Sequence, residues 1–81
     1  MFYVYILFSK THEIYYVGST SMVLEERLRR HLSAHKGFAA RAKDWEIVYQ
    51  ELFTNKSLAI LREKEIKKWK SKVKIEALIS K

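Results

Sequence analysis

The 81-residue chain holds phenol, guanidinium, imidazole and carboxylate side chains whose types and order suit work on a phosphodiester. Tyr5 and Tyr16 supply phenols, Arg27 and His31 supply a cation and an imidazole, and Glu63 supplies a carboxylate. Hydrolysis of a phosphodiester needs a base for the attacking water, a cation for the charge that develops on phosphate, and usually a divalent metal. Mg²⁺ keeps several waters and needs only one or two protein carboxylates, so Glu63 alone is chemically adequate.

The two phenols place a condition on this chemistry. A tyrosine with its ordinary pKa of about 10 is a poor base. It can serve only if a neighbouring cation, such as Arg27, lowers that pKa. We therefore expect the guanidinium to lie beside a phenol.

Two strands must position these phenols. Residues 3–8 are apolar or aromatic at every position, which is typical of a central strand covered on both faces. Residues 9–12, SKTH, form a short polar loop before the strand Ile14–Gly18, so the two runs predict an antiparallel hairpin that brings Tyr5 and Tyr16 to one region. Tyr15 then points to the other face and is interpreted as packing. Gly18 is expected to let the backbone turn tightly after the strand.

A cationic helix should follow the hairpin. One of residues 19–21, STS, can cap a helix that begins near Met22, with acidic residues early and basic residues late. Leucines 24, 28 and 32 give this helix one buried stripe. Arg27 and His31 are one turn apart and flank the stripe, so we expect them at the rim where the helix meets the sheet.

The second half of the chain predicts a loop or short helix around Gly37, a third strand over Glu46–Phe53 and a long helix from about Leu58 to Lys70. Asn55 or Ser57 can cap that helix. Its inward stripe is expected to contain Ala59, Arg62, Ile66, Trp69 and Val73. Arg62 is charged and therefore needs a partner. Residues 75–79 fit either a last helical turn or a short strand.

The order of these motifs resembles the GIY-YIG nuclease superfamily, and most closely its small single-domain branch, called URI or UPF0213. The matching segments are Tyr3-Val4-Tyr5, Tyr16-Val17-Gly18, residues 26–31 (ERLRRH) and residues 57–63 (SLAILRE). The resemblance spans Phe2 to about Lys70. Tyr3 stands where the family's first motif has glycine, a replacement common in the small branch.

The resemblance implies an α+β fold, with a three-stranded antiparallel sheet flanked by helices, and a metal-dependent cut of a DNA phosphodiester. By motif matching, Tyr5 and Tyr16 would orient or deprotonate the attacking water, and Arg27 would stabilise phosphate. His31 would assist proton transfer or contact the substrate. Glu63 would hold Mg²⁺ or Mn²⁺, and Gly18 would be structural at the site.

The charge of the chain favours polyanionic partners. Sixteen Lys and Arg against nine Asp and Glu give a formal charge of +7. Candidates for contact with nucleic acid, DNA above all, are Arg29, Arg30, Lys36, Arg41 and Lys43. The alternative is that these charges only face water.

Length and composition predict one domain over residues 1–81, without disulfides because there is no cysteine. No apolar run approaches the ~20 residues that cross a bilayer, so we expect a cytoplasmic protein without membrane partners.

Each site residue also has a purely structural interpretation. The tyrosines can be core aromatics of a hairpin, and Arg27 and His31 can belong to a solvated helix face. Glu63 can simply pair with Lys67 at i+4. At the level of function, the alternatives to an endonuclease are a nucleic-acid-binding module of the same fold without turnover and a protein-interaction domain that binds no nucleic acid.

Overall fold

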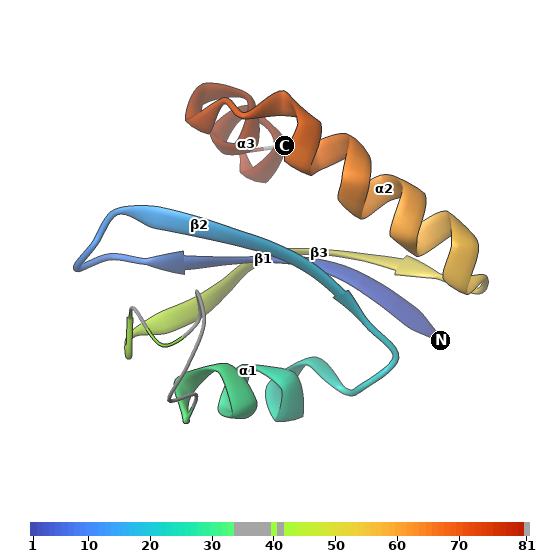
Figure 1. Ribbon diagram of the computed structural model, residues 1–81, viewed down its shortest axis with the longest axis horizontal. Helices are drawn as coiled ribbons and strands as arrows, with labels where there is room; N and C mark the ends of the chain where they lie inside the picture. The colour runs from blue at the N-terminus through green and yellow to red at the C-terminus, as the bar shows by residue number, and fades with distance from the viewer. Residues whose placement is uncertain (34–39, 41, 81) are drawn as a thin grey trace.

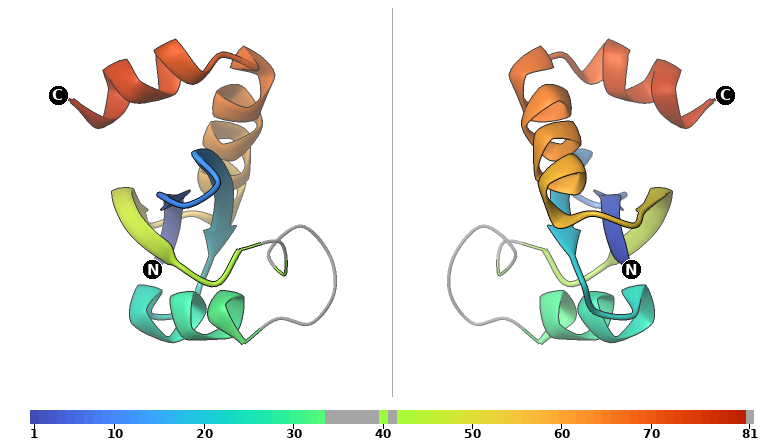
Figure 2. Two further views of the ribbon diagram at one scale, coloured as in Figure 1. Left: turned by 90° about the vertical axis from the view of Figure 1, so that its left-hand side faces the viewer. Right: turned by 90° about the vertical axis from the view of Figure 1, so that its right-hand side faces the viewer.

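The computed structural model describes residues 1–33, 40 and 42–80, which form a sheet between two helical layers. Strands Phe2–Ser9 (β1), Ile14–Thr20 (β2) and Trp45–Phe53 (β3) pair antiparallel in the order β2-β1-β3. Helix Leu24–Leu32 (α1) covers one face, and helices Lys56–Trp69 (α2) and Lys72–Ile79 (α3) lie on the other (Figures 1 and 2). The predicted α+β architecture and the interior place of β1 are confirmed. Within the described residues, no helix is long and apolar enough to span a membrane.

β1 is the shared wall of two apolar clusters. Val4 and Ile6 are buried toward α2 and α3, where they pack with Ile66 among others. Tyr5 and Leu7 are buried on the other face in the cluster that contains Leu24 and Trp45. Both faces of β1 are therefore covered, as its sequence predicted.

The loop of the hairpin is tied to the start of β3 by one carboxylate. Asp44 accepts hydrogen bonds from the Ser9 hydroxyl at 2.6 Å, the Thr11 amide at 2.9 Å and the Thr11 hydroxyl at 2.7 Å. These hydrogen bonds, with that of Ser9 the strongest, hold the pKa of Asp44 far below its usual range. These hydrogen bonds to Asp44 fix the loop between β1 and β2 against the start of β3.

The predicted cap of α1 is wrong. The helix begins at Leu24 after Val23, which makes no capping hydrogen bond through its side chain. The reason is that β2 continues to Thr20, which pairs with Tyr3, so residues 19 and 20 belong to the strand. The Thr20 hydroxyl instead accepts from the Met22 amide at 3.0 Å and closes the turn that leads to the helix.

The cap of α2 agrees with the sequence, but its predicted stripe does not reach as far as expected. The Asn55 carboxamide accepts from the Ser57 amide at 2.7 Å. The helix ends at Trp69 because Lys70 adopts a left-handed conformation with φ 46°. α3 then starts in a new direction, so Val73 is 74% exposed and the assignment of Val73 to the inward stripe is wrong. Residues 75–79 are helical rather than a strand.

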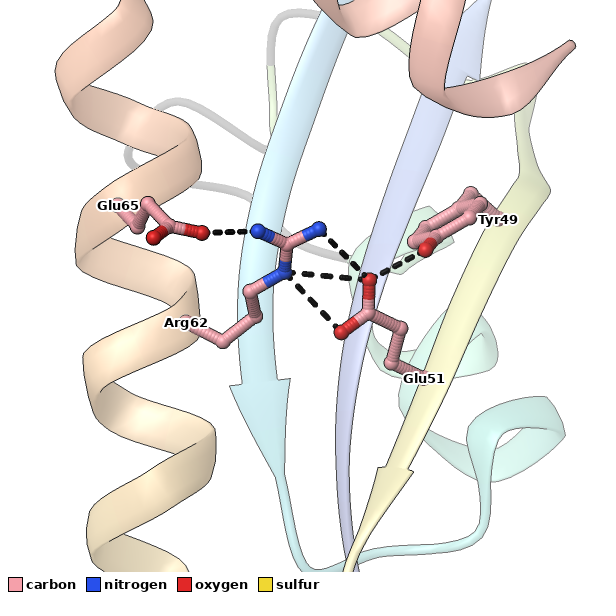
Figure 3. A network of polar contacts seen from close by, with 4 residues as sticks. All are labelled: Tyr49, Glu51, Arg62 and Glu65. Carbon is pink, nitrogen blue, oxygen red and sulfur yellow. Dashed lines mark hydrogen bonds and ion pairs between the residues drawn. The ribbon is translucent and has the colours of Figure 1, made fainter. Parts of the chain in front are cut away.

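Arg62 finds the partner that its place among apolar residues demands. Its Nε donates to both oxygens of Glu51 on β3, at 3.1 and 3.2 Å, and a terminal nitrogen donates to the same carboxylate at 3.1 Å (Figure 3). Glu65 and Tyr49 complete the network, and the guanidinium lies 5.7 Å from the centre of the Trp69 ring. These bonds fasten α2 to the strand at one edge of the sheet.

Candidate active site

The Tyr5 hydroxyl joins Arg27 and His31, the two candidate site residues of α1. It accepts a hydrogen bond from Arg27 Nε at 3.0 Å and lies 3.0 Å from His31 Nε2. Tyr5 is 1% exposed and His31 is 5% exposed. The expectation that Arg27 lies beside a phenol is therefore confirmed. The predicted rim position is wrong for His31, because its ring packs inward between α1 and the sheet instead of facing water.

Burial dominates the electrostatics of this network. It raises the pKa of Tyr5, and the opposing hydrogen bond and charge of Arg27 do not overcome it. Burial also lowers the pKa of His31, and the charge of Arg27 lowers it further. The phenol is therefore protonated and the imidazole neutral at pH 7. In the tautomer that carries its proton on Nδ1, His31 Nε2 accepts a hydrogen bond from the Tyr5 hydroxyl. A phenol can act as a base only if Arg27 lowers its pKa. Tyr5 does not meet this condition, because its pKa is raised.

Tyr16 is the more accessible of the two phenols. Its ring meets the edge of His31 at a centroid distance of 4.6 Å and lies 6.3 Å from Tyr5 and 6.2 Å from Trp45. It also lines a hollow of about 300 Å³ beside Lys67. Tyr16 thus combines contact with the buried network and access to solvent.

Gly18 makes room for the Tyr5 phenol. A Cβ at this position would lie 2.6 Å from Tyr5 Oη and 2.7 Å from Cζ, which is closer than packed atoms approach. The expected role of Gly18 in a tight turn after the strand is wrong, because β2 runs through it to Thr20. The glycine is required because β1 pairs Tyr5 directly with it and the phenol lies across its backbone.

Glu63 approaches the site from α2, on the opposite side of the sheet from α1. Its carboxylate accepts hydrogen bonds from the Ser19 hydroxyl and, at 2.6 Å, from Lys67 Nζ. Burial raises the pKa of Glu63, but the bonds from Lys67 and Ser19 outweigh it, so the pKa lies below the ordinary value and the group is ionised. The predicted i+4 pair with Lys67 is confirmed. The charge of Glu63 also contributes to the raised pKa of Tyr5, as the smallest of its causes.

The structure thus brings Tyr5, Tyr16, Arg27 and His31 together on the α1 face and sets Glu63 beyond the edge strand. Ser19, which sequence reasoning assigned only as a possible helix cap, is the residue of β2 that contacts Glu63. The alternation of the strand contained the signal, because Ser19 shares a face with Val17, whereas Gly18 lies on the opposite face with Tyr16.

Glu63 and Ser19 form a donor set that fits a hard cation. Both offer oxygen, which Mg²⁺ and Mn²⁺ prefer, and Mg²⁺ needs few protein ligands because it retains water. The carboxylate is ionised and partly exposed, with 19% of its side chain accessible. In the part of the chain that the structure describes, no group of three or more Asp, Glu, His or Cys side chains is placed so that it could hold a metal ion.

The predicted nucleic-acid contacts on α1 are open to solvent. Arg29 and Arg30 are exposed, and both lie near Glu26, with Arg30 Nε 4.0 Å from its carboxylate. Lys43 is also exposed. Lys36 and Arg41 lie outside the described residues, so their predicted role stays a prediction.

Comparison with protein families places the geometry in context. Searches of curated proteins and of solved structures give no significant match. The family model described as the GIY-YIG catalytic domain matches residues 1–76, a span that contains the strands and helices bearing Tyr5, Tyr16, Arg27, His31 and Glu63. The chain therefore belongs to the GIY-YIG family and carries its catalytic domain.

Proposed function

We propose that the chain is a Mg²⁺- or Mn²⁺-dependent endonuclease that hydrolyses DNA phosphodiester bonds and belongs to the small single-domain branch of its family. The GIY-YIG catalytic domain implies nuclease activity. The observation that carries the finer proposal is the Tyr5 hydroxyl held between Arg27 and His31, with an ionised Glu63 nearby.

The candidate site residues differ in exposure, and we assign their roles in hydrolysis accordingly. Tyr16 reaches solvent and orients the attacking water. Arg27 is held through Nε by Tyr5 and has further N–H donors for a phosphate oxygen, where its charge offsets the charge that develops in the transition state. Tyr5 is buried and acts through its hydrogen bond to His31. The phenol proton passes to His31 Nε2 as the phenol oxygen takes the proton that the attacking water loses.

Glu63, with Ser19 beside it, would hold the divalent cation. Such an ion supplies a positive charge that stabilises the leaving oxygen. The chain's own contribution is an acid kept ionised by Lys67 and Ser19 and oriented by both.

Glu63→Gln tests the proposal against a matched control, Glu65→Gln, two residues further along the same helix. Purified protein is incubated with single-stranded, branched and duplex DNA in the presence of Mg²⁺ or Mn²⁺. We expect Glu63→Gln to abolish cutting and Glu65→Gln, which only loses its exposed pair with Arg62, to retain it. If Glu63→Gln cuts as well as the parent, the assignment of Glu63 is wrong.

A second candidate function is a nucleic-acid-binding module without turnover. The burial of Tyr5 and His31 beside Trp45 favours it, since these aromatic rings also fill the core. This alternative predicts mobility shifts without cleavage on every substrate, with affinity that falls steeply as salt rises. A protein-interaction domain would instead give no shift at low salt.

A further inference from the structure

A row of hollows follows the outer edge of β2, where α2 and α3 pack beside it. One hollow of about 130 Å³ is lined by residues 19–21 and by Lys56 at the start of α2. The next, of about 300 Å³, is lined by residues 15–17 and Lys67. The last, of about 290 Å³, is lined by residues 13–15, by Lys67 and Lys70 of the α2 end, and by Lys72 of α3.

These hollows succeed one another because β2 and α2 run side by side in opposite directions. The hollow at the end of β2 contains the first residue of α2, and the hollow at the beginning of β2 contains the last turn of α2. Ser19 lines the hollow at the end of β2 and donates to Glu63, which lies on α2 between its first residue and its last turn. The seven residues of β2 extend over roughly 23 Å. We call this row the β2 groove, and it passes directly by the proposed metal ligand.

The charge of the β2 groove is predominantly positive. Lys56, Lys67, Lys70 and Lys72 line it. The acids at the groove are Glu13, Glu63 and Glu76, which interacts with Tyr15. Lys67 is paired with Glu63, whereas Lys72 Nζ donates to the backbone carbonyl of residue 13 at 2.7 Å, which fixes its position without neutralising its charge. The groove therefore presents ammonium groups on the same path as the acid.

The walls of the groove also suit the other parts of a nucleotide. Within the described residues β2 is an edge strand, so part of its backbone N–H groups points away from β1 and toward the groove side. The partly exposed rings of Tyr15 and Tyr16 line its middle. Aromatic rings beside a positively charged track are typical of proteins that bind single-stranded nucleic acid.

We propose that the β2 groove binds an unpaired nucleic-acid strand that flanks the scissile phosphate, with Lys70 and Lys72 contacting its backbone at the α2–α3 end. The proposal rests on the proposed function and adds the path of the substrate strand. The β2 groove is distinct from the nucleic-acid contacts predicted from the sequence, which lie on α1 and in the segment after it.

Charge reversal at the two groove lysines tests this path. Lys70→Glu/Lys72→Glu is compared with Lys68→Glu/Lys74→Glu, which makes the same change of net charge on the same two helices and their junction, at exposed residues outside those lining the groove. Binding of a fluorescent single-stranded DNA oligonucleotide is measured by anisotropy in EDTA, over a series of salt concentrations. A Lys70→Gln/Lys72→Gln variant and thermal unfolding of all proteins guard against a folding defect.

We expect the groove variant to bind at least about tenfold more weakly than the control, and the slope of log K against log[salt] to fall by about 1.4, as for two lost phosphate contacts on a single strand. The Gln variant should show the same loss of slope with a smaller loss of affinity. Equal affinities and slopes for the groove and control variants would overturn the proposal, as would preferential binding of a duplex of the same sequence.

The binding assay separates this inference from the proposed function because it needs no turnover. If the parent cuts DNA but the groove and control variants bind alike, the path is wrong and the nuclease assignment stands. If the parent cuts nothing but the groove variant alone loses binding, the path stands and the nuclease assignment fails. A parent that binds no oligonucleotide contradicts both.

Discussion

At the scale of single residues, the Tyr5 hydroxyl determines the protonation of the site. Its raised pKa and the lowered pKa of His31 both keep the proton on the phenol in the free protein. A phenol that holds its proton is not itself a base, so under the proposed function Tyr5 can take a proton from water only as it passes its own proton to His31. The position of Tyr5 over Gly18 makes this arrangement sensitive to one methyl group.

Gly18→Ala should disrupt the site by displacing the Tyr5 phenol. The added Cβ meets the hydroxyl at 2.6 Å, so the ring must shift and its bonds to Arg27 and His31 are lost. Overpacking of this kind costs about 1–3 kcal/mol. We expect a loss of that size in the free energy of urea unfolding, together with loss of DNA cleavage.

Tyr5→Phe provides the control for this prediction. Removing the hydroxyl relieves the closest contact of the new methyl group, so Gly18→Ala should cost less stability in a Tyr5→Phe background. The double-mutant cycle should give a coupling of at least about 0.5 kcal/mol, the size seen for residues in contact. Additive effects would show that the hydroxyl is not the atom that the alanine displaces, because the contact with ring carbon Cζ at 2.7 Å is present in both backgrounds.

At the scale of elements, the Arg62–Glu51 pair controls how α2 sits on the sheet. Arg62 precedes Glu63, and its bonds to β3 fix the helix on the side opposite its contact with β2 (Figure 3). The two side chains are 26% and 22% exposed, so removing one partner should cost less than in a fully buried pair but more than in a surface pair.

Arg62→Met should leave the Glu51 carboxylate with the Tyr49 hydroxyl as its remaining described partner. Loss of a partner to a partly buried charge costs about 1–3 kcal/mol, and we expect urea unfolding to show it. Glu65→Ala removes only the exposed member of the network and should cost less than about 1 kcal/mol. Replacing Glu51 by Gln in the Arg62→Met protein should recover part of the loss. Equal costs for Arg62→Met and Glu65→Ala would contradict the role of Glu51.

The elements themselves were predictable because their patterns are local. Each pattern lies within a few residues of chain. The apolar residues on both faces predict the strand β1, the short polar loop predicts the hairpin, and Asn55 predicts the start of α2. The start of α1 was not predictable in the same way, since it depends on how far β2 pairs with β1, at Tyr3 and Thr20. Val73 was misplaced because the left-handed Lys70 ends the period of α2.

The candidate site shows the same division between local pattern and long-range geometry. Motif order predicted which residues gather around Tyr5, since the hairpin and one helical turn suffice to bring them together. Burial of His31 and the contact of Ser19 with Glu63 depend on the packing of α1 and α2 against the sheet. No periodicity within either segment contains that information.

At the scale of the whole molecule, acid should remove stability in two separate ranges of pH. Glu51 and Glu63 have pKa values below the ordinary value, so their contribution is full above about pH 4.5 and is lost as the pH falls below it. His31 removes stability in a higher range, as the pH falls below about 6.5. The net charge of +7 becomes more positive in both ranges, so added protons also increase repulsion.

The His31 range can be isolated by working between pH 7.5 and 5. The ordinary pKa of histidine is 6.5 and that of His31 in the folded protein is lower, because burial and Arg27 oppose its charge. As the pH falls below 6.5, His31 takes up a proton in the unfolded chain but stays neutral in the folded protein, so the free energy of unfolding decreases. Tyr5 and Tyr16 face the imidazole. Tyr5, whose pKa is raised by burial, stays neutral in this range, and Arg27 stays charged. Urea unfolding at a series of pH values should therefore show a steady loss of stability, with the folded protein most stable above pH 6.5.

His31→Gln should flatten this dependence, whatever its effect on stability at pH 7.5, because the titrating group is gone. His12→Gln is the matched control, since His12 is exposed in the loop between β1 and β2, and it should keep the dependence of the parent. If His31→Gln loses stability with acid as steeply as the parent, the imidazole is not held neutral in the folded protein. The proton transfer proposed between Tyr5 and His31 would then fail with it, because an imidazolium cannot accept the phenol proton.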